Sequence, residues 1–156
     1  MNSILEAPAS SPTGAVIEHG EPPRILVVDD DGDVRNLEAA ILKRVGHRVD
    51  TAEDGESAWQ ALVGRNYDLL VTDHIMPGES GLALVRRLRV ANITLPVVMV
   101  SGTLENLDTA RLSRDPWSHI HAFVHKPFTQ PELLSAVQGA LASEFSSRAD
   151  GSSTAG

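Results

Sequence analysis

The chain has 156 residues, of which 42% are hydrophobic and 22% charged, a composition typical of one globular domain with a real core. Pro and charged residues interrupt every apolar stretch before it reaches the length of a membrane span, and the net charge of −8 disfavours a general nucleic-acid footprint. The lack of Cys excludes disulfides and thiolate metal sites, and the N-terminus lacks the pattern of a secretory signal; both features fit a cytoplasmic protein.

Composition divides the chain into three parts. Residues 1–23 are rich in Ala, Ser, Pro and Gly, which predicts a disordered N-terminal extension. Residues 143–156 become rich in Ser, Ala and Gly, which predicts a flexible tail after the last helix. The folded body is therefore expected to be a single domain over residues 24–142.

Strands and helices alternate along the first half of this body. The apolar run 25–28 predicts a strand, and apolar residues at helical spacing over 34–45 predict a helix that ends at Gly46. A second strand is predicted at 48–52. Asp54 has the residue type that caps a helix, so the next helix is expected to begin there.

The same alternation continues in the second half. A third strand is predicted at 69–72, and Ser80 is expected to cap the helix that follows it. The fourth strand is predicted at 97–100. A weaker helical pattern over 106–113 comes next, and Pro116 lies beyond its end.

The last pair of elements completes the pattern. A short strand is predicted at 122–124, and Thr129 followed by Glu132 is the sequence pattern of a capping box for the final helix. Alternating strands and helices imply an α/β fold, in which a parallel sheet carries helices on both faces. The run 48–52 contains Arg and Asp, which favours an edge position for that strand.

Four of the five predicted strands are followed by residues that suit phosphoryl chemistry. These residues are Asp29 with Asp30, Asp73, Ser101 and Lys126. In an open parallel sheet, ligands bind at the carboxyl ends of the strands, so these side chains can converge on one site. Three carboxylates would attract a hard divalent cation such as Mg²⁺, and an aspartate can itself be the nucleophile that forms an acyl phosphate.

The segments that carry this pattern resemble the receiver domain of two-component response regulators (CheY-like). They are Ile25–Asp31, Asp73–Gly81, Val97–Gly102 and Lys126–Phe128. The resemblance covers the whole body, residues 24–142. It implies a doubly wound (βα)5 sandwich of flavodoxin-like topology, with a five-stranded parallel sheet of order 2-1-3-4-5.

The resemblance also implies how the acidic residues divide their roles. Asp73 falls on the phosphoacceptor of the family, and Mg²⁺ is the implied cofactor. Asp30 matches the direct metal ligand, and Asp29 matches the carboxylate that reaches the metal through water. Ile75, two residues after the phosphoacceptor, would supply a backbone carbonyl to the metal.

Three further positions match the family's switch. Ser101 matches the hydroxyl that moves to the phosphoryl group, although Thr is the commoner residue there. Phe123 matches the aromatic switch position, and Lys126 matches the lysine of the catalytic pocket. In the family, the face made by helix four, strand five and helix five is the common output surface, so a downstream protein target is expected on it.

The function implied is a phosphorylation-dependent switch in a two-component system or phosphorelay. The donor would be a phosphohistidine on a sensor histidine kinase or a histidine phosphotransfer protein. Such a domain catalyses only its own phosphorylation and dephosphorylation, so the chain is expected to be a signalling domain and not an enzyme. No output domain follows in the sequence, so we expect a stand-alone receiver without nucleic-acid or membrane partners.

Two other functions remain open at this point. The segment Asp29–Asp33 is similar to the nucleophile motif of haloacid dehalogenase-like phosphatases, with Asp29 as the nucleophile. In that reading Asp33 stands where Thr is expected, and Asp73 has no role. A phosphate-independent interaction module of receiver fold is the other alternative, which the complete acidic pocket disfavours.

The stretch 102–122 departs from the family pattern because it is longer than usual and lacks the usual Gly-Ala pair before strand five. We interpret His119, His121 and His125 as surface residues, with a metal site as the alternative. Trp117 is expected to cover the core beneath a long loop, and an exposed interface anchor is the alternative.

Two smaller features have simple interpretations. Arg86, Arg87 and Arg89 form the one local basic cluster, and we interpret them as a solvated helix face, with docking of an acidic partner as the alternative. His74 directly follows Asp73 and is expected in a mobile loop, where a role in partner choice is the alternative.

Overall fold

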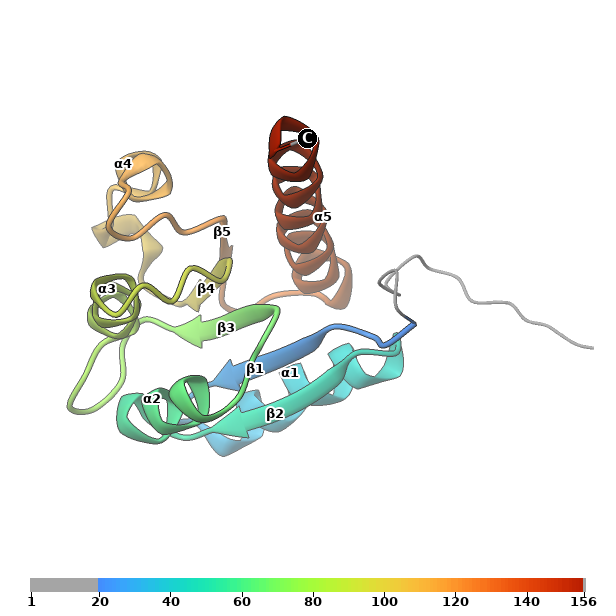
Figure 1. Ribbon diagram of the computed structural model, residues 1–156. Coiled ribbons are helices and arrows are strands. Elements are labelled where there is room, and N and C mark those ends of the chain that lie inside the picture. The colour runs from blue at the N-terminus through green and yellow to red at the C-terminus, as the bar shows by residue number, and fades with distance from the viewer. Residues whose placement is uncertain (1–19, 156) are drawn as a thin grey trace, which may run out of the picture.

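A computed structural model describes residues 20–155. Its centre is a parallel five-stranded sheet in the order β2-β1-β3-β4-β5 (Figure 1). The strands are β1 Arg24–Val28, β2 Arg48–Ala52, β3 Leu69–Asp73, β4 Val97–Ser101 and β5 Ala122–His125. The predicted fold class and the predicted edge position of β2 are therefore confirmed.

Helices cover both faces of the sheet (Figure 1). They are α1 Gly32–Arg44, α2 Gly55–Gly64, α3 Gly81–Val90, α4 Thr109–Arg114 and α5 Gln130–Ala155, with a short 3-10 helix, η3, at Leu104–Asn106. Side chains alternate along a strand, so Leu26 belongs to a core that includes residues of α2, α3 and α4, whereas Ile25 belongs to a core that includes residues of α1 and α5. Two apolar cores therefore flank the sheet.

The helix ends follow the local signals of the sequence. Asp54 accepts a hydrogen bond from the backbone N–H of Ser57, and Ser80 caps α3 in the same way. The N–H of Thr129 donates to Glu132 Oε1 and the N–H of Glu132 donates to Thr129 Oγ1, which forms a capping box at the start of α5. Gly46 has a φ of 102°, the conformation that lets the chain leave α1 and enter β2.

The final helix is longer than the sequence predicts. A flexible tail is predicted from residue 143, but α5 continues to Ala155. Extending a helix that already exists needs no new nucleus, so α5 can continue through a segment whose residues would not start a helix on their own. Of the predicted N-terminal extension, residues 1–19 lie outside the described residues.

The stretch 102–122 folds into η3, α4 and a turn that leads to β5. The helix predicted at 106–113 is found at 109–114. Ser118 and Ile120 are buried, whereas Trp117, which precedes them in the turn after α4, is 61% exposed. The prediction that Trp117 covers the core is therefore wrong, because Ile120 fills that place and Trp117 points away.

Arg89 joins the end of α3 to this turn. Its guanidinium is buried and donates hydrogen bonds to the backbone carbonyls of Ile93, Leu95, Ser118 and His119. Arg89 therefore does not belong to a solvated face, contrary to prediction. A buried cation is tolerated here because carbonyl oxygens satisfy its donors.

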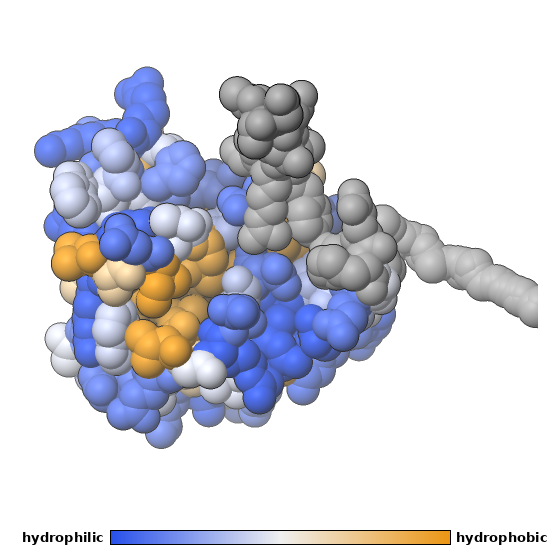
Figure 2. Space-filling model, viewed as in Figure 1, coloured by the Kyte–Doolittle hydropathy of each residue, from blue (hydrophilic) through white to orange (hydrophobic). Residues whose placement is uncertain are grey.

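The surface is mostly hydrophilic in the view of Figure 2, with an apolar area around α2 and α3. Val63 on α2 and Val90 on α3 are among the large exposed hydrophobic residues. None of the helices in the described part of the chain is both long and apolar enough to cross a membrane.

Candidate functional site

The predicted site residues meet at the carboxyl edge of the sheet. Asp29 and Asp30 directly follow β1, Asp73 ends β3, Ser101 ends β4 and Lys126 directly follows β5. Carboxylate oxygens of the three aspartates lie within 4.8 Å of one another. The parallel order of the strands brings these residues together, although up to 97 positions separate them along the chain.

Asp29 is the most enclosed of the three carboxylates, with 1% of the residue exposed. Its Oδ1 accepts a hydrogen bond from the N–H of Asp31 at 2.9 Å, and its Oδ2 accepts one from Lys126 Nζ at 2.9 Å. Each carboxylate oxygen of Asp29 therefore accepts a hydrogen bond, which fixes the orientation of the side chain. The Asp29 carbonyl also accepts a hydrogen bond from the guanidinium of Arg35, which fixes the start of α1 beside the site.

Asp73 is the second carboxylate of the cluster that contacts the lysine. Its Oδ1 accepts a hydrogen bond from the N–H of His74 at 2.8 Å, and its Oδ2 lies 3.4 Å from Lys126 Nζ. Burial raises the pKa of Asp73, and the negative charge of Asp29 acts in the same direction against the lowering effect of Lys126. This crowding of negative charge is what a divalent cation would relieve.

Lys126 is the cation of the site and contacts two of the carboxylates. Burial alone would lower the pKa of Lys126, but its hydrogen bond to Asp29 and the charges of Asp73 and Asp29 outweigh burial and raise it. The N–H of Lys126 donates to the carbonyl of Ser101, and the Lys126–Pro127 peptide bond is cis. The ammonium is therefore charged at neutral pH and fixed between Asp29 and Asp73.

The two predicted switch residues lie on neighbouring strands, Ser101 at the end of β4 and Phe123 within β5. Ser101 is buried, and its Oγ contacts Thr103 Oγ1 at 3.2 Å and accepts a hydrogen bond from the N–H of Thr103. Phe123 is partly buried against the core on the α2, α3 and α4 side. Thr103 thus holds the Ser101 hydroxyl in this structure.

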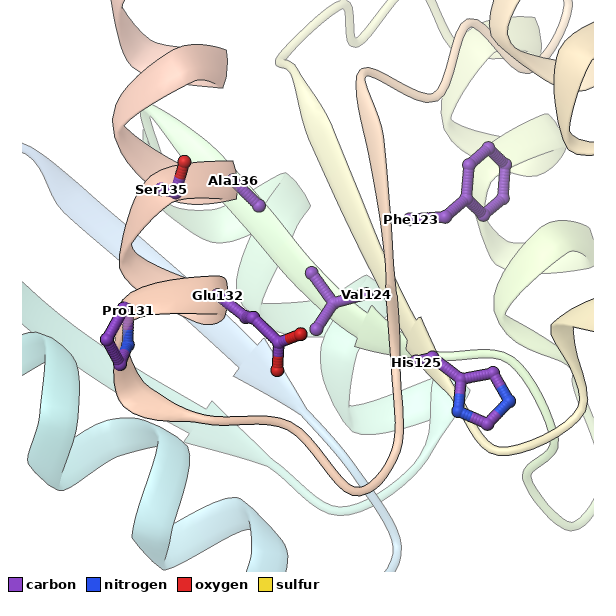
Figure 3. A pocket seen from close by; sticks show the side chains of 7 residues that line it. All are labelled: Phe123, Val124, His125, Pro131, Glu132, Ser135 and Ala136. Carbon is purple, nitrogen blue, oxygen red and sulfur yellow. The ribbon is translucent and has the colours of Figure 1, made fainter.

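A groove of about 600 Å³ lies beside β5 and the first turns of α5 (Figure 3). Its lining residues are Phe123, Val124, His125, Pro131, Glu132, Ser135 and Ala136. Figure 3 shows Val124 directed toward α5, whereas Phe123 and His125 extend to the opposite side of β5. The groove thus opens on the face expected to carry the output.

The donor set fits Mg²⁺. The aspartates offer only oxygen ligands, and Asp30 is exposed, so a partly hydrated cation can approach from solvent. Three carboxylates and one ammonium leave a formal charge of −2, which a divalent cation neutralises. Among the described residues, this is the one group of acids and histidines close enough to hold a metal.

The histidines lie outside the carboxylate cluster. His119, His121 and His125 are exposed, and His125 Nε2 lies 3.7 Å from Glu105, in agreement with surface residues. His74 lies in the β3–α3 loop, and its Nδ1 is buried without a hydrogen-bond partner among the described residues. Burial lowers the pKa of His74, so its ring is neutral near the acidic cluster.

Sequence reasoning missed one acidic residue close to the site. Glu38 on α1 is 1% exposed, and neither carboxylate oxygen has a hydrogen-bond partner among the described residues. Burial, then the charge of Asp29, raises the pKa of Glu38 to about 8. The signal was present, since Glu38 lies four residues from Val34 and from Leu42 on the apolar stripe of α1.

Gly81 allows the β3–α3 loop to close against Asp73. Its N–H donates to the carbonyl of His74 at 2.8 Å, and a Cβ on Gly81 would overlap the carbonyl oxygen of Asp73. We expect Gly81→Ala to lower the free energy of unfolding by about 3 kcal/mol, measured by urea titration.

Gly64 provides the matched control for that prediction, since it is helical and nothing lies within 4 Å of its added Cβ. Gly64→Ala should be neutral or stabilising by up to about 1 kcal/mol. Equal effects of the two substitutions would contradict the steric explanation.

Comparison with known proteins agrees with this geometry. Residues 25–138 match the family model described as the response regulator receiver domain. The DNA-binding transcriptional regulator NtrC of Azospirillum brasilense is 34% identical over 117 residues, which cover 75% of this chain and 24% of that protein. Protein PetR of Rhodobacter capsulatus is 34% identical over 123 residues, covering 77% of this chain and 49% of PetR.

Solved structures show the same likeness. NtrX from Brucella abortus superposes with a TM-score of 0.75 and 33% identity, covering 83% of this chain and 29% of NtrX. The receiver domain of the Francisella response regulator 1452 superposes with a TM-score of 0.66 and 27% identity, covering 78% of this chain and 98% of that domain. The chain thus spans about a quarter of one curated relative and about half of the other, and nearly all of a receiver domain.

Proposed function

Since the chain belongs to the response regulator receiver domain family and is a phosphorylation-dependent switch of a two-component system, we propose that Asp73 is its phosphoacceptor. The partner of a receiver domain is a histidine kinase. We propose that the donor is a phosphohistidine on a sensor kinase or on a histidine phosphotransfer protein. Because such donors are made from ATP, we propose that the exchange takes place in the cytoplasm.

One observation supports this assignment most strongly. The Asp73 carboxylate lies within 4.8 Å of two other carboxylates, and Lys126 Nζ contacts both Asp29 and Asp73. Phosphoryl transfer needs in-line positioning and neutralisation of the phosphoryl oxygens more than it needs covalent help. This arrangement offers a nucleophile with fixed positive charge beside it.

The transfer proceeds at a carboxylate oxygen of Asp73. That oxygen attacks phosphorus, the P–N bond to the imidazole breaks, and the imidazole nitrogen takes a proton from solvent. Lys126 stabilises negative charge on one phosphoryl oxygen, and the N–H of His74 remains directed at the Asp73 carboxylate. The product is an aspartyl phosphate.

Mg²⁺ would be held by Asp30, Asp73 and the backbone carbonyl of Ile75, with Asp29 reached through water. When bound, Mg²⁺ neutralises phosphoryl oxygens and offsets the charge of the carboxylates. Asp29 orients Lys126 through their 2.9 Å hydrogen bond. We propose that hydrolysis of the aspartyl phosphate uses the same groups.

The response is proposed to pass through Ser101 and Phe123. The Ser101 hydroxyl leaves Thr103 for the new phosphoryl group, and Phe123 then changes its packing against the adjacent core. The change reaches the α4-β5-α5 face, where the groove beside β5 is proposed to take a downstream protein. The net charge of −8 favours a protein over nucleic acid as the target of this domain.

The site gives the phosphatase alternative no support. In the motif that begins at Asp29, the second carboxylate belongs to Asp31. That carboxylate is the N-cap of α1 and accepts hydrogen bonds from the N–H groups of Asp33 and Val34. It is therefore committed to the helix and does not serve as a general acid.

Phosphotransfer from a panel of autophosphorylated kinases and phosphotransfer proteins tests the proposal. We expect label to pass to the full chain with Mg²⁺ and not with EDTA, and Asp73→Asn to take no label. Asp33→Asn is the matched control, since Asp33 is exposed on the first turn of α1, and it should take label normally. Label on Asp73→Asn, or transfer in EDTA, would contradict the proposal.

A further inference from the structure

Ser101 ends β4 at the carboxyl edge of the sheet, and its hydroxyl is enclosed by the protein. The residue is 1% exposed. Its backbone is fixed, because the Ser101 carbonyl accepts a hydrogen bond from the N–H of Lys126 and because Ser101 is paired with His125 in the register of β4 and β5. The part of Ser101 that can respond most easily to a phosphoryl group is therefore its hydroxyl, and the partners of that hydroxyl decide how easily it responds.

The single proton of the Ser101 hydroxyl has one acceptor, Thr103 Oγ1. The two hydroxyl oxygens lie 3.2 Å apart, and Ser101 Oγ also accepts a hydrogen bond from the N–H of Thr103 at 3.2 Å. No other residue in the described part of the chain forms a hydrogen bond with Ser101 Oγ. A buried donor without an acceptor is costly, whereas Thr103 is only partly buried and can turn its own proton to water. The Ser101 hydroxyl is therefore the donor of this hydrogen bond.

The side chain of Thr103 does not cap the short helix that it precedes. Thr103 occupies the N-cap position of η3, where a Thr hydroxyl ordinarily accepts a hydrogen bond from a backbone N–H of the first turn. Thr103 makes no such side-chain bond to η3. Its hydroxyl contacts Ser101 instead, so the local signal for a helix cap is used for a contact with the proposed switch residue.

We infer that Thr103 is a positioning residue of the switch, whose hydroxyl stabilises the unphosphorylated arrangement of Ser101 and thereby opposes binding of a phosphoryl group. The inference rests on the proposed function, in which the Ser101 hydroxyl moves to the phosphoryl group. Because Ser101 has one hydroxyl proton, a phosphoryl oxygen must replace Thr103 Oγ1 as its acceptor. The free energy that Thr103 contributes to the unphosphorylated arrangement is lost in that exchange, so it lowers the apparent affinity for the phosphoryl group.

Titration of the full chain with beryllium fluoride in the presence of Mg²⁺ tests the inference, because beryllium fluoride binds a carboxylate oxygen as a phosphoryl group does. Fluorine NMR measures the bound fraction. Thr103→Val replaces the hydroxyl by a methyl group and should tighten binding about fivefold. Thr103→Ser keeps the hydroxyl and should bind as the parent chain does. Thr109→Val is the matched control, because the Thr109 hydroxyl has no hydrogen bond to another described residue, and its affinity should also equal that of the parent.

A double-mutant cycle shows whether Thr103 acts through Ser101. Ser101→Ala should weaken binding of beryllium fluoride, since a hydrogen bond to an anion is stronger than one between two hydroxyls. In the Ser101→Ala background, Thr103→Val should leave the affinity unchanged. Binding by Thr103→Val that is no tighter than that of the parent, or equal tightening in the Ser101→Ala background, would overturn the inference alone. A parent chain that does not bind beryllium fluoride, or binds it no more tightly than Ser101→Ala, would overturn the proposed function and this inference with it.

Discussion

Glu38→Leu should raise the free energy of unfolding by about 4 kcal/mol at pH 8 and by only about 1 kcal/mol at pH 5. Burial in the folded protein raises the pKa of Glu38 from its ordinary value of 4.5 to about 8. The unfolded chain therefore loses its proton first, and stability falls as pH rises between these values. Below pH 4.5 Glu38 is protonated in both the folded and the unfolded state, so its burial no longer lowers the stability. Stability therefore falls with rising pH because the buried carboxyl group is more stable in its neutral form.

Urea unfolding in EDTA at several pH values from 5 to 8 measures this effect. The parent chain should lose up to about 1.4 kcal/mol of stability per pH unit through this one group, and Glu38→Leu should remove that slope. Glu53→Leu is the control, because Glu53 is exposed and no comparable change is expected. Parallel pH slopes for Glu38→Leu and the parent would contradict the assignment of a buried neutral acid.

Lys126→Met should destabilise the protein by about 2 kcal/mol without Mg²⁺, and Mg²⁺ should restore most of the loss. The substitution removes the cation from Asp29, which is 1% exposed, and leaves three carboxylates to repel one another. The formal charge of the pocket becomes −3, so Mg²⁺ is expected to bind about tenfold more tightly.

Thermal or urea unfolding at increasing Mg²⁺ concentration measures how far Mg²⁺ replaces the missing ammonium of Lys126. Lys43→Met is the matched control, since Lys43 is the other lysine of the chain and is exposed on α1. Its stability should respond to Mg²⁺ as the parent chain does. A Lys126→Met protein that Mg²⁺ does not stabilise more than the parent would show that the two cations do not share the pocket.

The parts of the structure that the sequence predicts well depend on signals with short range. The strands appear as apolar runs, and the caps at Asp54, Ser80 and Thr129 each depend on a hydrogen bond three residues away. The convergence of Asp29, Asp73 and Lys126 follows from strand direction alone once the sheet is known to be parallel. Both the fold and the centre of the site are therefore predictable from local pattern.

The parts that were missed depend on contacts between distant segments. Arg89 resembles its exposed neighbours in sequence, and only the carbonyls of a turn 29 residues later make its burial acceptable. Trp117 and Ile120 are both apolar residues that could cover the core, and local pattern does not decide which of them is buried. Burial of Glu38 does not follow from local pattern, because an acidic residue on the apolar stripe of a helix is expected to face solvent.

Identification of the phosphorylated residue tests the central claim most directly. The full chain is treated with acetyl phosphate and Mg²⁺, and borohydride then reduces any aspartyl phosphate to homoserine, which peptide sequencing locates. We expect homoserine at position 73 and unmodified aspartate at each of the other aspartate positions. Homoserine at position 29, or no aspartyl phosphate at all, would contradict the assignment of Asp73 as the phosphoacceptor.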